Sequence, residues 1–274
     1  MVKLRTIITI MFWQKNVKNC NGGIKMNNNI YDDKSFFDNY IKLRNDPNNI
    51  AANEIVEMPA IYNELPNLEG KRVLDLGCGS GNNCIKAVEL GASYVVGIDV
   101  SKNMIELANE VNKDEKITYK NISMENISLL KDKFDVIISS LAFHYIEDYD
   151  KLLKDIYKLL NKKGLLIFSQ EHPLSTGTIL NEACNFKSKL KLGGKEYKLL
   201  SDYNINGPRE MNWLGGTYTK YHRNISCLIN GLINNNYKLC KIVEPIASEE
   251  NVKKNPKYKN QLNMPYFMII VAQK

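Results

Sequence analysis

The chain has 274 residues, of which 44% are hydrophobic, and a formal net charge of +7. This length and composition suit one α/β domain with an insertion and exclude a low-complexity chain. The first 30 residues hold five basic residues and no acid, so the remainder carries only +2. That remainder lacks the basic stripe of a nucleic-acid-binding surface. No apolar run approaches the length of about 18 residues that spans a membrane. We expect neither nucleic acid nor a membrane as partner.

The N-terminal segment, residues 1–25, precedes a second methionine, Met26. Residues 6–13 are apolar and follow basic residues, but this core is short and no small-residue cleavage site follows it. We therefore prefer to interpret residues 1–25 as a disordered extension rather than a signal peptide. Residues 26–274 would then form the folded domain.

Apolar spacing predicts strands and helices in alternation along the rest of the chain. Strands are expected at residues 73–76, 94–99, 117–121, 134–140, 165–169, 238–243 and 266–271. Helical stripes are expected at residues 36–44, 51–62, 82–90, 104–111, 152–160 and 221–232. Ser101 is a suitable N-cap for one of these helices, and Gly164 is expected to end another. The pattern predicts a doubly wound, Rossmann-like, seven-stranded and mostly parallel α/β sheet with helices on both faces.

One segment, residues 173–217, interrupts this alternation and is rich in Gly, Lys, Tyr and Asn. It follows the fifth strand, so it begins at the carboxyl end of the sheet, where open α/β sheets bind ligands. We expect it to form an insertion that covers the substrate site, with Trp213 as one apolar wall.

A glycine-rich turn follows the first strand, in the run Arg-Val-Leu-Asp-Leu-Gly-Cys-Gly-Ser-Gly of residues 72–81. Gly77, Gly79 and Gly81 allow positive φ and a close approach of the backbone to a ligand. The turn opens a helix, so it forms a site for a small polar or anionic group. The second strand ends at Asp99, where a carboxylate can bind both hydroxyls of a ribose.

The acid at Asp75, two residues before the first glycine, distinguishes two cofactor classes. Dinucleotide enzymes use G-x-G-x-x-G around a pyrophosphate, and that pattern is missing here. A carboxylate at this point would repel a pyrophosphate but suits the ammonium group of an amino acid. The sequence therefore favours S-adenosylmethionine (SAM) over a dinucleotide.

With this loop the chain resembles the class I SAM-dependent methyltransferases. Over residues 31–274 it is similar to the bacterial type 11 methyltransferases, whose substrates are usually small molecules. The matching stretches include residues 36–44, 57–59, 70–79, 139–145, 168–173, 213–215, 220–223 and 244–245.

The resemblance implies a set of site residues. The expected cofactor-binding residues are Asp75, Gly77, Cys78, Gly79, Asp99, Val100, Met104, Met124, Glu125, Ser140, Tyr40 and Arg44. Their position in or directly after the insertion makes Trp213, Tyr221, His222 and Arg223 the expected substrate-binding residues.

All three histidines fall after a strand end or beside the insertion, at His144, His172 and His222. A histidine can act as a general base near neutral pH, although any single one is more often structural. Methyl transfer needs a base only when the acceptor must lose a proton. His144, His172 and Glu171 are the candidate catalytic residues.

The six cysteines include no Cys-x-x-Cys pair, so we expect no metal site. Unpaired cysteines are typical of the reducing cytoplasm. The leading hypothesis is a SAM-dependent enzyme with a small-molecule acceptor. The alternatives are an RNA methyltransferase, a nucleotide-dependent oxidoreductase and a non-catalytic SAM-binding protein. The acceptor and the oligomeric state stay open.

Overall fold

The computed structural model describes residues 29–46, 51–178, 189–193, 195–198 and 200–274. The expected N-terminal extension lies outside these residues. A seven-stranded sheet forms the centre, in the order β10-β11-β5-β4-β1-β2-β3. The strands are β1 (Arg72–Leu76), β2 (Tyr94–Asp99), β3 (Ile117–Asn121), β4 (Phe134–Ser139), β5 (Leu160–Glu171), β10 (Lys238–Val243) and β11 (Phe267–Gln273).

In this sheet β11 runs opposite to the other six strands. It pairs with β5 and with β10 in that sense, whereas the pairs β1–β2, β2–β3, β1–β4 and β4–β5 are parallel. The predicted doubly wound, mostly parallel sheet is confirmed. Parallel strands end at one edge, so the residues that follow β1, β2, β4 and β5 meet there.

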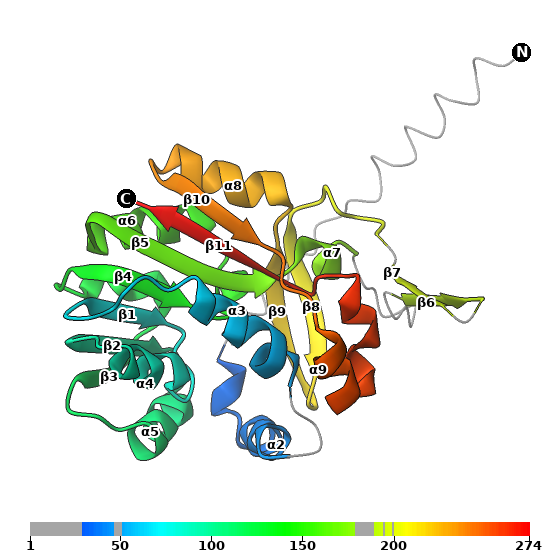
Figure 1. Ribbon diagram of the computed structural model, residues 1–274, viewed down its shortest axis with the longest axis horizontal. Coiled ribbons are helices and arrows are strands. Elements are labelled where there is room, and N and C mark those ends of the chain that lie inside the picture. Colours follow the sequence, from blue (N-terminus) through cyan, green and yellow to red (C-terminus); the bar gives the residue numbers. More distant parts are fainter. Residues whose placement is uncertain (1–28, 47–50, 179–188, 194, 199) are drawn as a thin grey trace, which may run out of the picture.

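Helices cover both faces of the sheet (Figure 1). The α-helices are α2 (Lys34–Arg44), α3 (Met58–Asn63), α4 (Asn82–Glu89), α5 (Lys102–Val111), α6 (Tyr149–Leu159), α7 (Pro173–Thr176), α8 (Ile225–Asn234) and α9 (Glu249–Lys254). Shorter helical elements are η1 (Ile30–Asp32), η2 (Asn53–Glu57), η3 (Met124–Leu129), η4 (Phe143–Tyr145) and η6 (Pro256–Leu262).

The residues of β1 alternate between two hydrophobic cores. Leu74 and Leu76 belong to one core cluster with Leu228 of α8, whereas Val73 belongs to another with Ala87 of α4. Successive side chains of a strand point to opposite faces of the sheet. A sheet that is covered by helices on both faces therefore needs apolar side chains on each face. Burial on both faces holds the strand ends in place.

Capping residues set where several helices begin. The Ser101 hydroxyl accepts a hydrogen bond from the Met104 amide at 3.2 Å, which confirms the predicted N-cap of α5. The predicted end of α6 at Gly164 is wrong, because this helix ends at Leu159. Leu160 is already extended and pairs with β4, so β5 begins well before the glycine.

Where the structure describes it, the insertion contains α7 and two hairpins. The hairpins are β6 (Lys189–Leu192) with β7 (Lys195–Lys198), and β8 (Gly207–Trp213) with β9 (Gly216–His222). Figure 1 shows β8 and β9 crossing the end of the sheet, whereas β6 and β7 stand away from it. The long hairpin is the part of the insertion that reaches the strand ends.

Two boundaries at the end of the insertion differ from the prediction. Residues 173–217 stop inside β9, which continues to His222. Tyr221 is not part of a helix, because it pairs with Pro208 across the hairpin, and α8 begins at Ile225. The buried residues Tyr218, Lys220 and His222 follow a period of two along β9, which a helical interpretation of this stretch concealed.

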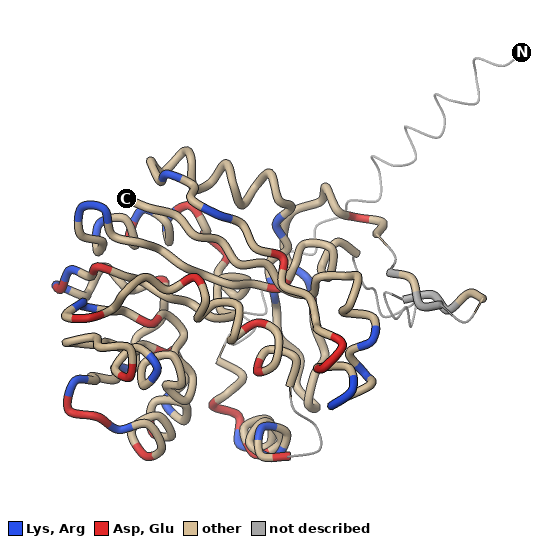
Figure 2. The backbone as a smooth tube through the Cα atoms, in the orientation of Figure 1, with Lys and Arg blue, Asp and Glu red and all other residues tan. Residues whose placement is uncertain are grey.

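Basic and acidic residues are interspersed along the described backbone (Figure 2). In the described part of the chain, no helix combines the length and the apolar character that crossing a membrane requires.

Candidate functional site

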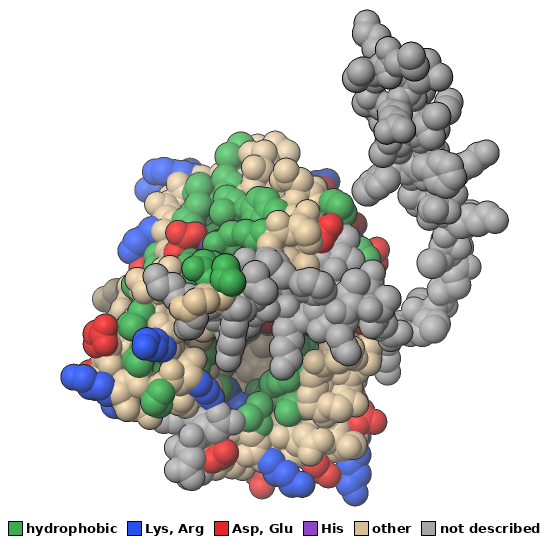
Figure 3. Space-filling model, turned by 90° about the vertical axis from the view of Figure 1, so that its right-hand side faces the viewer, with side chains coloured by type: hydrophobic (Ala, Val, Ile, Leu, Met, Phe, Trp, Pro, Cys, Tyr) green, Lys and Arg blue, Asp and Glu red, His purple; other side chains and the backbone are tan. Residues whose placement is uncertain are grey.

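A cavity of about 500 Å³ lies where the strand ends meet the β8–β9 hairpin and the N-terminal helices. Figure 3 looks at this end of the molecule and shows a hollow in the surface. Of the predicted site residues, those that line it are Tyr40, Arg44, Gly77, Cys78, Gly79, Asp99, Val100, Met104, Met124, Glu125, Ser140, His144, Glu171 and Trp213. A volume of this size is typical of a small-molecule or cofactor site.

The glycine loop forms one wall of the cavity through its main chain. The amides of Gly77 and Cys78 both donate to the Ile98 carbonyl, at 2.9 and 2.8 Å, which ties the loop to β2. A Cβ on Gly77 would lie 2.6 Å from that of Ala142, so the loop and the end of β4 touch here. A Cβ on Gly79 would meet no atom within 4 Å, because this residue faces the open cavity.

The Asp99 carboxylate stands at the end of β2 beside this loop. Its two oxygens accept hydrogen bonds from the amides of Gly79, at 3.0 Å, and Ser101, at 2.8 Å. Burial raises the pKa of Asp99, and these amides oppose the shift. The buried thioether side chains of Met104 and Met124 lie nearby in the lining. A carboxylate beside an apolar surface fits the ribose and adenine of SAM.

Asp75 lies behind the lining rather than in it. Its carboxyl is fully buried and accepts hydrogen bonds from Asn83 Nδ2 and from Cys84 Sγ, each at 3.5 Å. Burial raises its pKa to about 7. Asp75 therefore ties β1 to the start of α4, and Asn83 connects it to the cavity. A contact between Asp75 and the methionine end of SAM stays a prediction.

The N-terminal helices close the same half of the cavity. Arg44 makes an ion pair with Glu54 and a hydrogen bond to Asn53, both at 3.0 Å. The ring of Tyr40 packs edge-on against that of Tyr31, with centroids 5.2 Å apart. Both tyrosines line the cavity, although the sequence pointed only to Tyr40.

A buried carboxyl that sequence reasoning missed lies beneath the end of β4. Glu57 is fully buried and accepts hydrogen bonds from Ser140 Oγ, at 2.9 and 3.1 Å, and from Ser169 Oγ. Burial raises its pKa to about 7 against the effect of these hydroxyls. Leu141, with a φ of 52°, donates its amide to Ser169 Oγ at 3.0 Å. No local pattern around Glu57 could have revealed partners so distant in the chain.

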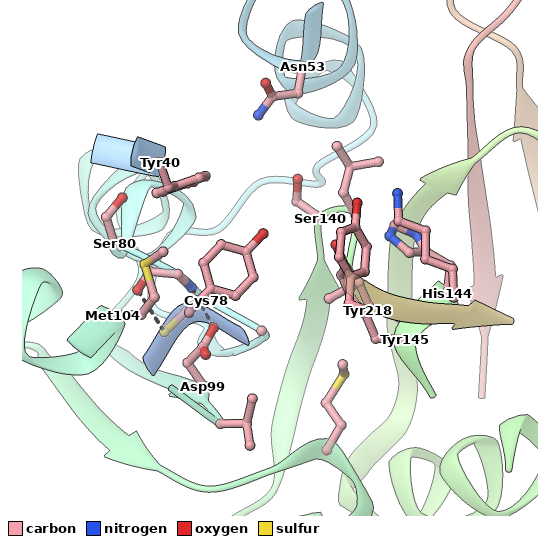
Figure 4. A pocket seen from close by; sticks show the side chains of 18 of the residues that line it. Tyr40, Asn53, Cys78, Ser80, Asp99, Met104, Ser140, His144, Tyr145 and Tyr218 are labelled. Carbon is pink, nitrogen blue, oxygen red and sulfur yellow. Dashed lines mark hydrogen bonds between the residues drawn. The ribbon is translucent and has the colours of Figure 1, made fainter. Parts of the chain in front are cut away.

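The other half of the cavity is lined by side chains from η4, β5 and β9. Figure 4 shows His144, Tyr145 and Tyr218 on one side of Ser140, with Tyr40, Cys78 and Asp99 on the other. Ring centroids lie 4.5 Å apart for His144 and Tyr145, and 5.9 Å apart for Tyr145 and Tyr218. Burial, assisted by the nearby Lys220, lowers the pKa of His144 to about 3, so its imidazole is neutral.

Two lining residues of β9, Tyr218 and Lys220, were also missed. Lys220 Nζ lies 2.5 Å from Glu171 Oε1. Tyr218, Lys220 and His222 alternate along β9 and are buried together. A strand assignment for residues 216–222 would have predicted this shared face.

Two of the predicted histidines are engaged away from the cavity. His172 Nε2 lies 2.6 Å from Glu244 Oε1, and its Nδ1 caps the start of α7. His222 bonds to Thr176 Oγ1 at 2.7 Å. Neither lines the cavity. His172 connects the start of α7 to the segment after β10, and His222 connects α7 to the end of β9.

Of the other predicted substrate residues, some line the cavity and some lie outside its lining. Arg223 donates to the main-chain carbonyls of Ile146 and Glu147, the latter at 2.8 Å, and lies outside the cavity lining. Tyr221 is also outside it. Trp213 does line the cavity, with its ring 6.3 Å from that of Tyr40. Across the residues described, no cluster of three or more His, Cys, Asp or Glu is placed to hold a metal.

Fold and site together define a class I, Rossmann-like, SAM-binding enzyme. The sequence profile of a family described as a methyltransferase domain matches residues 67–219, more than half of the chain. The chain belongs to this methyltransferase family, and it is an S-adenosylmethionine-dependent methyltransferase.

Three individual relatives are similar to different extents of the chain. An uncharacterized protein of Haemophilus influenzae is 37% identical over 257 residues, which cover 91% of this chain and 99% of that protein. A SAM-dependent methyltransferase from Mesorhizobium loti has a similar structure, with a TM-score of 0.72 and 31% identity over 80% of this chain and 97% of its own. A ribosomal protein L11 methyltransferase from Thermotoga neapolitana is 33% identical over 101 residues, 37% of each chain.

Proposed function

We propose that this methyltransferase transfers the methyl group of SAM to a small-molecule acceptor bound under the β8–β9 hairpin. The observation that carries the proposal is the acceptor half of the cavity. It is lined by the buried side chains of His144 from η4 and of Tyr218 and Lys220 from β9, one strand of the hairpin that crosses the strand ends. A cavity of about 500 Å³ with several aromatic side chains in its lining suits a small ligand better than a segment of macromolecule.

The cofactor half supports specific roles for the predicted residues. Asp99 would hold the ribose hydroxyls, and the adenine would lie against Val100, Met104, Met124 and Glu125. The loop with Gly77, Cys78 and Gly79 would hold the methionine part, supported from behind by Asp75. Tyr40, Arg44 and Ser140 would close the site from the other side.

Catalysis would rest mainly on alignment. When bound, SAM supplies an electrophilic methyl group on a sulfonium, and the reaction is a direct displacement. The protein's part is to hold the acceptor atom in line with that methyl and to keep water out. His144 is neutral and buried, so it would orient the acceptor by a hydrogen bond, whereas Glu171 is placed to take a proton.

A thermal-shift screen of small metabolites in the presence of SAM tests the proposal. Compounds that raise the melting temperature would then be incubated with enzyme and SAM, and mass spectrometry would detect the gain of one methylene. We expect methylated small molecules, and their loss when Asp99 is replaced by alanine. Methylation of ribosomal proteins or RNA alone would contradict the proposal.

We also propose that residues 26–274 form one domain, with the insertion as its substrate cover. A chain that starts at Met26 should keep the melting temperature and SAM affinity of the full chain. Calorimetry on both chains checks this, and a large fall in melting temperature would show that residues 1–25 belong to the fold.

A further inference from the structure

The acceptor half of the cavity contains a buried ion pair. Lys220 Nζ lies 2.5 Å from Glu171 Oε1, and the lysine side chain is only 6% exposed against 27% for the glutamate. Nζ also lies 5.4 Å and 5.9 Å from the ring centroids of Tyr218 and Tyr145. Burial alone would lower the pKa of Lys220, but Glu171 and Tyr218 raise it above its ordinary value. The group is therefore an ammonium at neutral pH.

Stability alone does not account for this pair. Removing two charges from water is expensive, and an apolar pair of similar volume is often as stable or more so. Both residues line the cavity, so the pair faces the site where an acceptor would bind. The partial exposure of Glu171 leaves a path for protons to reach solvent, whereas Lys220 is enclosed.

The groups around the pair leave Lys220 as the cation that faces the acceptor. His144 is neutral, with its pKa lowered to about 3 by burial, and its Nδ1 is buried without a hydrogen-bond partner among the described residues. Arg44, a second cation of the described lining, is paired with Glu54 in the cofactor half. The tyrosines of the acceptor half, Tyr145 and Tyr218, have raised pKa values because they are buried, and stay neutral.

We propose that the methyl acceptor is an acidic hydroxyl compound, a phenol or an enol, whose proton passes to Glu171 and whose oxyanion is held by Lys220. This inference rests on the proposed function and specifies its substrate class. A cation within about 4–6 Å lowers the pKa of an acid by roughly 1–3 units, which brings a phenol of pKa near 10 toward neutrality. Transfer to an amine would build positive charge on the acceptor nitrogen beside the Lys220 ammonium, which would repel it.

The pair suits this proton transfer because it conserves charge. The Glu171 carboxylate takes the hydroxyl proton and becomes neutral, while the Lys220 ammonium exchanges the carboxylate for the new oxyanion. One cation and one anion are present before and after, so no isolated charge forms in the buried site. The oxyanion then forms the O–C bond as the S–C bond breaks and its electron pair returns to sulfur. Glu171 finally releases the proton to solvent.

The ionisation of bound 4-nitrophenol, whose colour reports its charge state, provides a direct test. We would titrate it against pH on the enzyme saturated with S-adenosylhomocysteine. The apparent pKa of the bound phenol should lie at least about 1 unit below that of the free compound. Lys220→Met should abolish this shift, Lys220→Arg should retain it, and Lys154→Met, at an exposed site on α6, should not alter it.

A second variant, Glu171→Gln, separates proton transfer from acceptor binding. It also tests the proposal if Lys220→Met does not fold. Glu171→Gln should keep the spectral shift of 4-nitrophenol but lower kcat about 100-fold for methylation of 4-methylphenol, with KM little changed, because this less acidic phenol keeps its proton at neutral pH and needs the base. A normal kcat for Glu171→Gln, or an unshifted or unbound phenol on the wild-type enzyme, would overturn the proposal.

Matched acceptors distinguish this inference from the proposed function. The enzyme would be incubated with SAM and 4-nitrophenol, 4-nitroaniline or 4-nitrothiophenol. O-methylation supports both proposals. Methylation only at nitrogen or sulfur overturns the hydroxyl class but leaves a small-molecule methyltransferase. No methylation of any of the three, with SAM bound and protein substrates methylated, overturns both.

Discussion

The two halves of the cavity are built from different parts of the chain and by different means. The half proposed to bind the cofactor centres on one main-chain loop, where the amides of Gly77 and Gly79 bond to the end of β2. The acceptor half is made by side chains from segments far apart, as in the pair of Glu171 with Lys220. One half depends on backbone conformation, and the other on how an inserted hairpin packs against the sheet.

This difference predicts that substitutions in the two halves change different measured quantities. Substitutions in the cofactor half should act on stability and SAM affinity, because the same hydrogen bonds hold the loop and shape the site. Substitutions in the acceptor half should act on turnover and leave SAM affinity close to normal, because sites without shared partners contribute independently.

Gly77→Ala should have the largest effect. Its φ is 71°, and a Cβ would lie 2.6 Å from that of Ala142. Left-handed strain costs about 1–2 kcal/mol and overpacking about 1–3 kcal/mol, so we expect a loss of about 2–5 kcal/mol in the free energy of unfolding. Gly79→Ala is the matched control, because only strain applies there and its Cβ faces the cavity. Urea unfolding measures the stability of both variants. Equal losses of unfolding free energy would contradict the close contact between Gly77 and Ala142.

Glu57 lies where the two halves meet, and its effect should depend on pH. Burial raises its pKa from 4.5 to about 7, so the folded protein binds its proton more tightly than the unfolded chain. The stabilisation is complete below pH 4.5 and is lost as the pH rises through 7, by about 3 kcal/mol in all at 1.36 kcal/mol per unit.

Glu57→Gln should remove this part of the pH dependence. Unfolding free energies measured between pH 4.5 and 8 would show it as a flatter profile than that of the wild type. Asp75, whose pKa is also raised to about 7, contributes a similar slope, so Asp75→Asn is the comparison variant. Identical pH profiles of unfolding free energy for the wild type and Glu57→Gln would show that Glu57 does not contribute to the pH dependence.

Asp99→Ala should weaken SAM binding by about 2–3 kcal/mol, the cost of hydrogen bonds to a charged group. Tyr218→Phe in the acceptor half should change SAM affinity by less than about 0.5 kcal/mol. Isothermal calorimetry on both variants sharpens the comparison directly. If Asp99→Ala binds SAM with unchanged affinity, Asp99 does not hold the ribose of the cofactor.

The histidines should show the smallest effects and separate structure from catalysis. His172 caps α7 and bonds to Glu244, so His172→Ala should cost about 1 kcal/mol of stability and reduce activity only as the folded fraction falls. His144→Ala should lower turnover at least about tenfold at unchanged SAM affinity, through lost acceptor alignment. Melting temperatures and transfer rates on both variants decide this, and the reverse pattern would show that His172 is the functional one.

Sequence reasoning located the sheet, and the residues predicted for the cofactor line the cavity, except Asp75. The strand that ends at Asp99 is found at the predicted residues, and the glycine loop follows β1 as expected. These features depend on apolar runs and on glycine positions within a few tens of residues. Local spacing is enough to predict them, because the parallel sheet places its strand ends together.

The acceptor half was predicted only in part. His144, Glu171 and Trp213 line the cavity, but His172, His222 and Arg223 are engaged in contacts outside its lining. A position near a strand end does not determine which way a side chain points. Tyr218 and Lys220 were missed for the same reason, since their inward orientation depends on the register of β9.

The sequence by itself determined the α/β sheet, the glycine loop and the carboxylate at the end of β2, because each follows from backbone preferences and local periodicity. Only the tertiary structure decided that Glu57 lies buried against Ser140 and Ser169, and that Lys220 faces Glu171 across the acceptor half. Those contacts join residues between 49 and 112 positions apart. Their geometry comes from how helices and hairpins pack around the sheet, which no local pattern encodes.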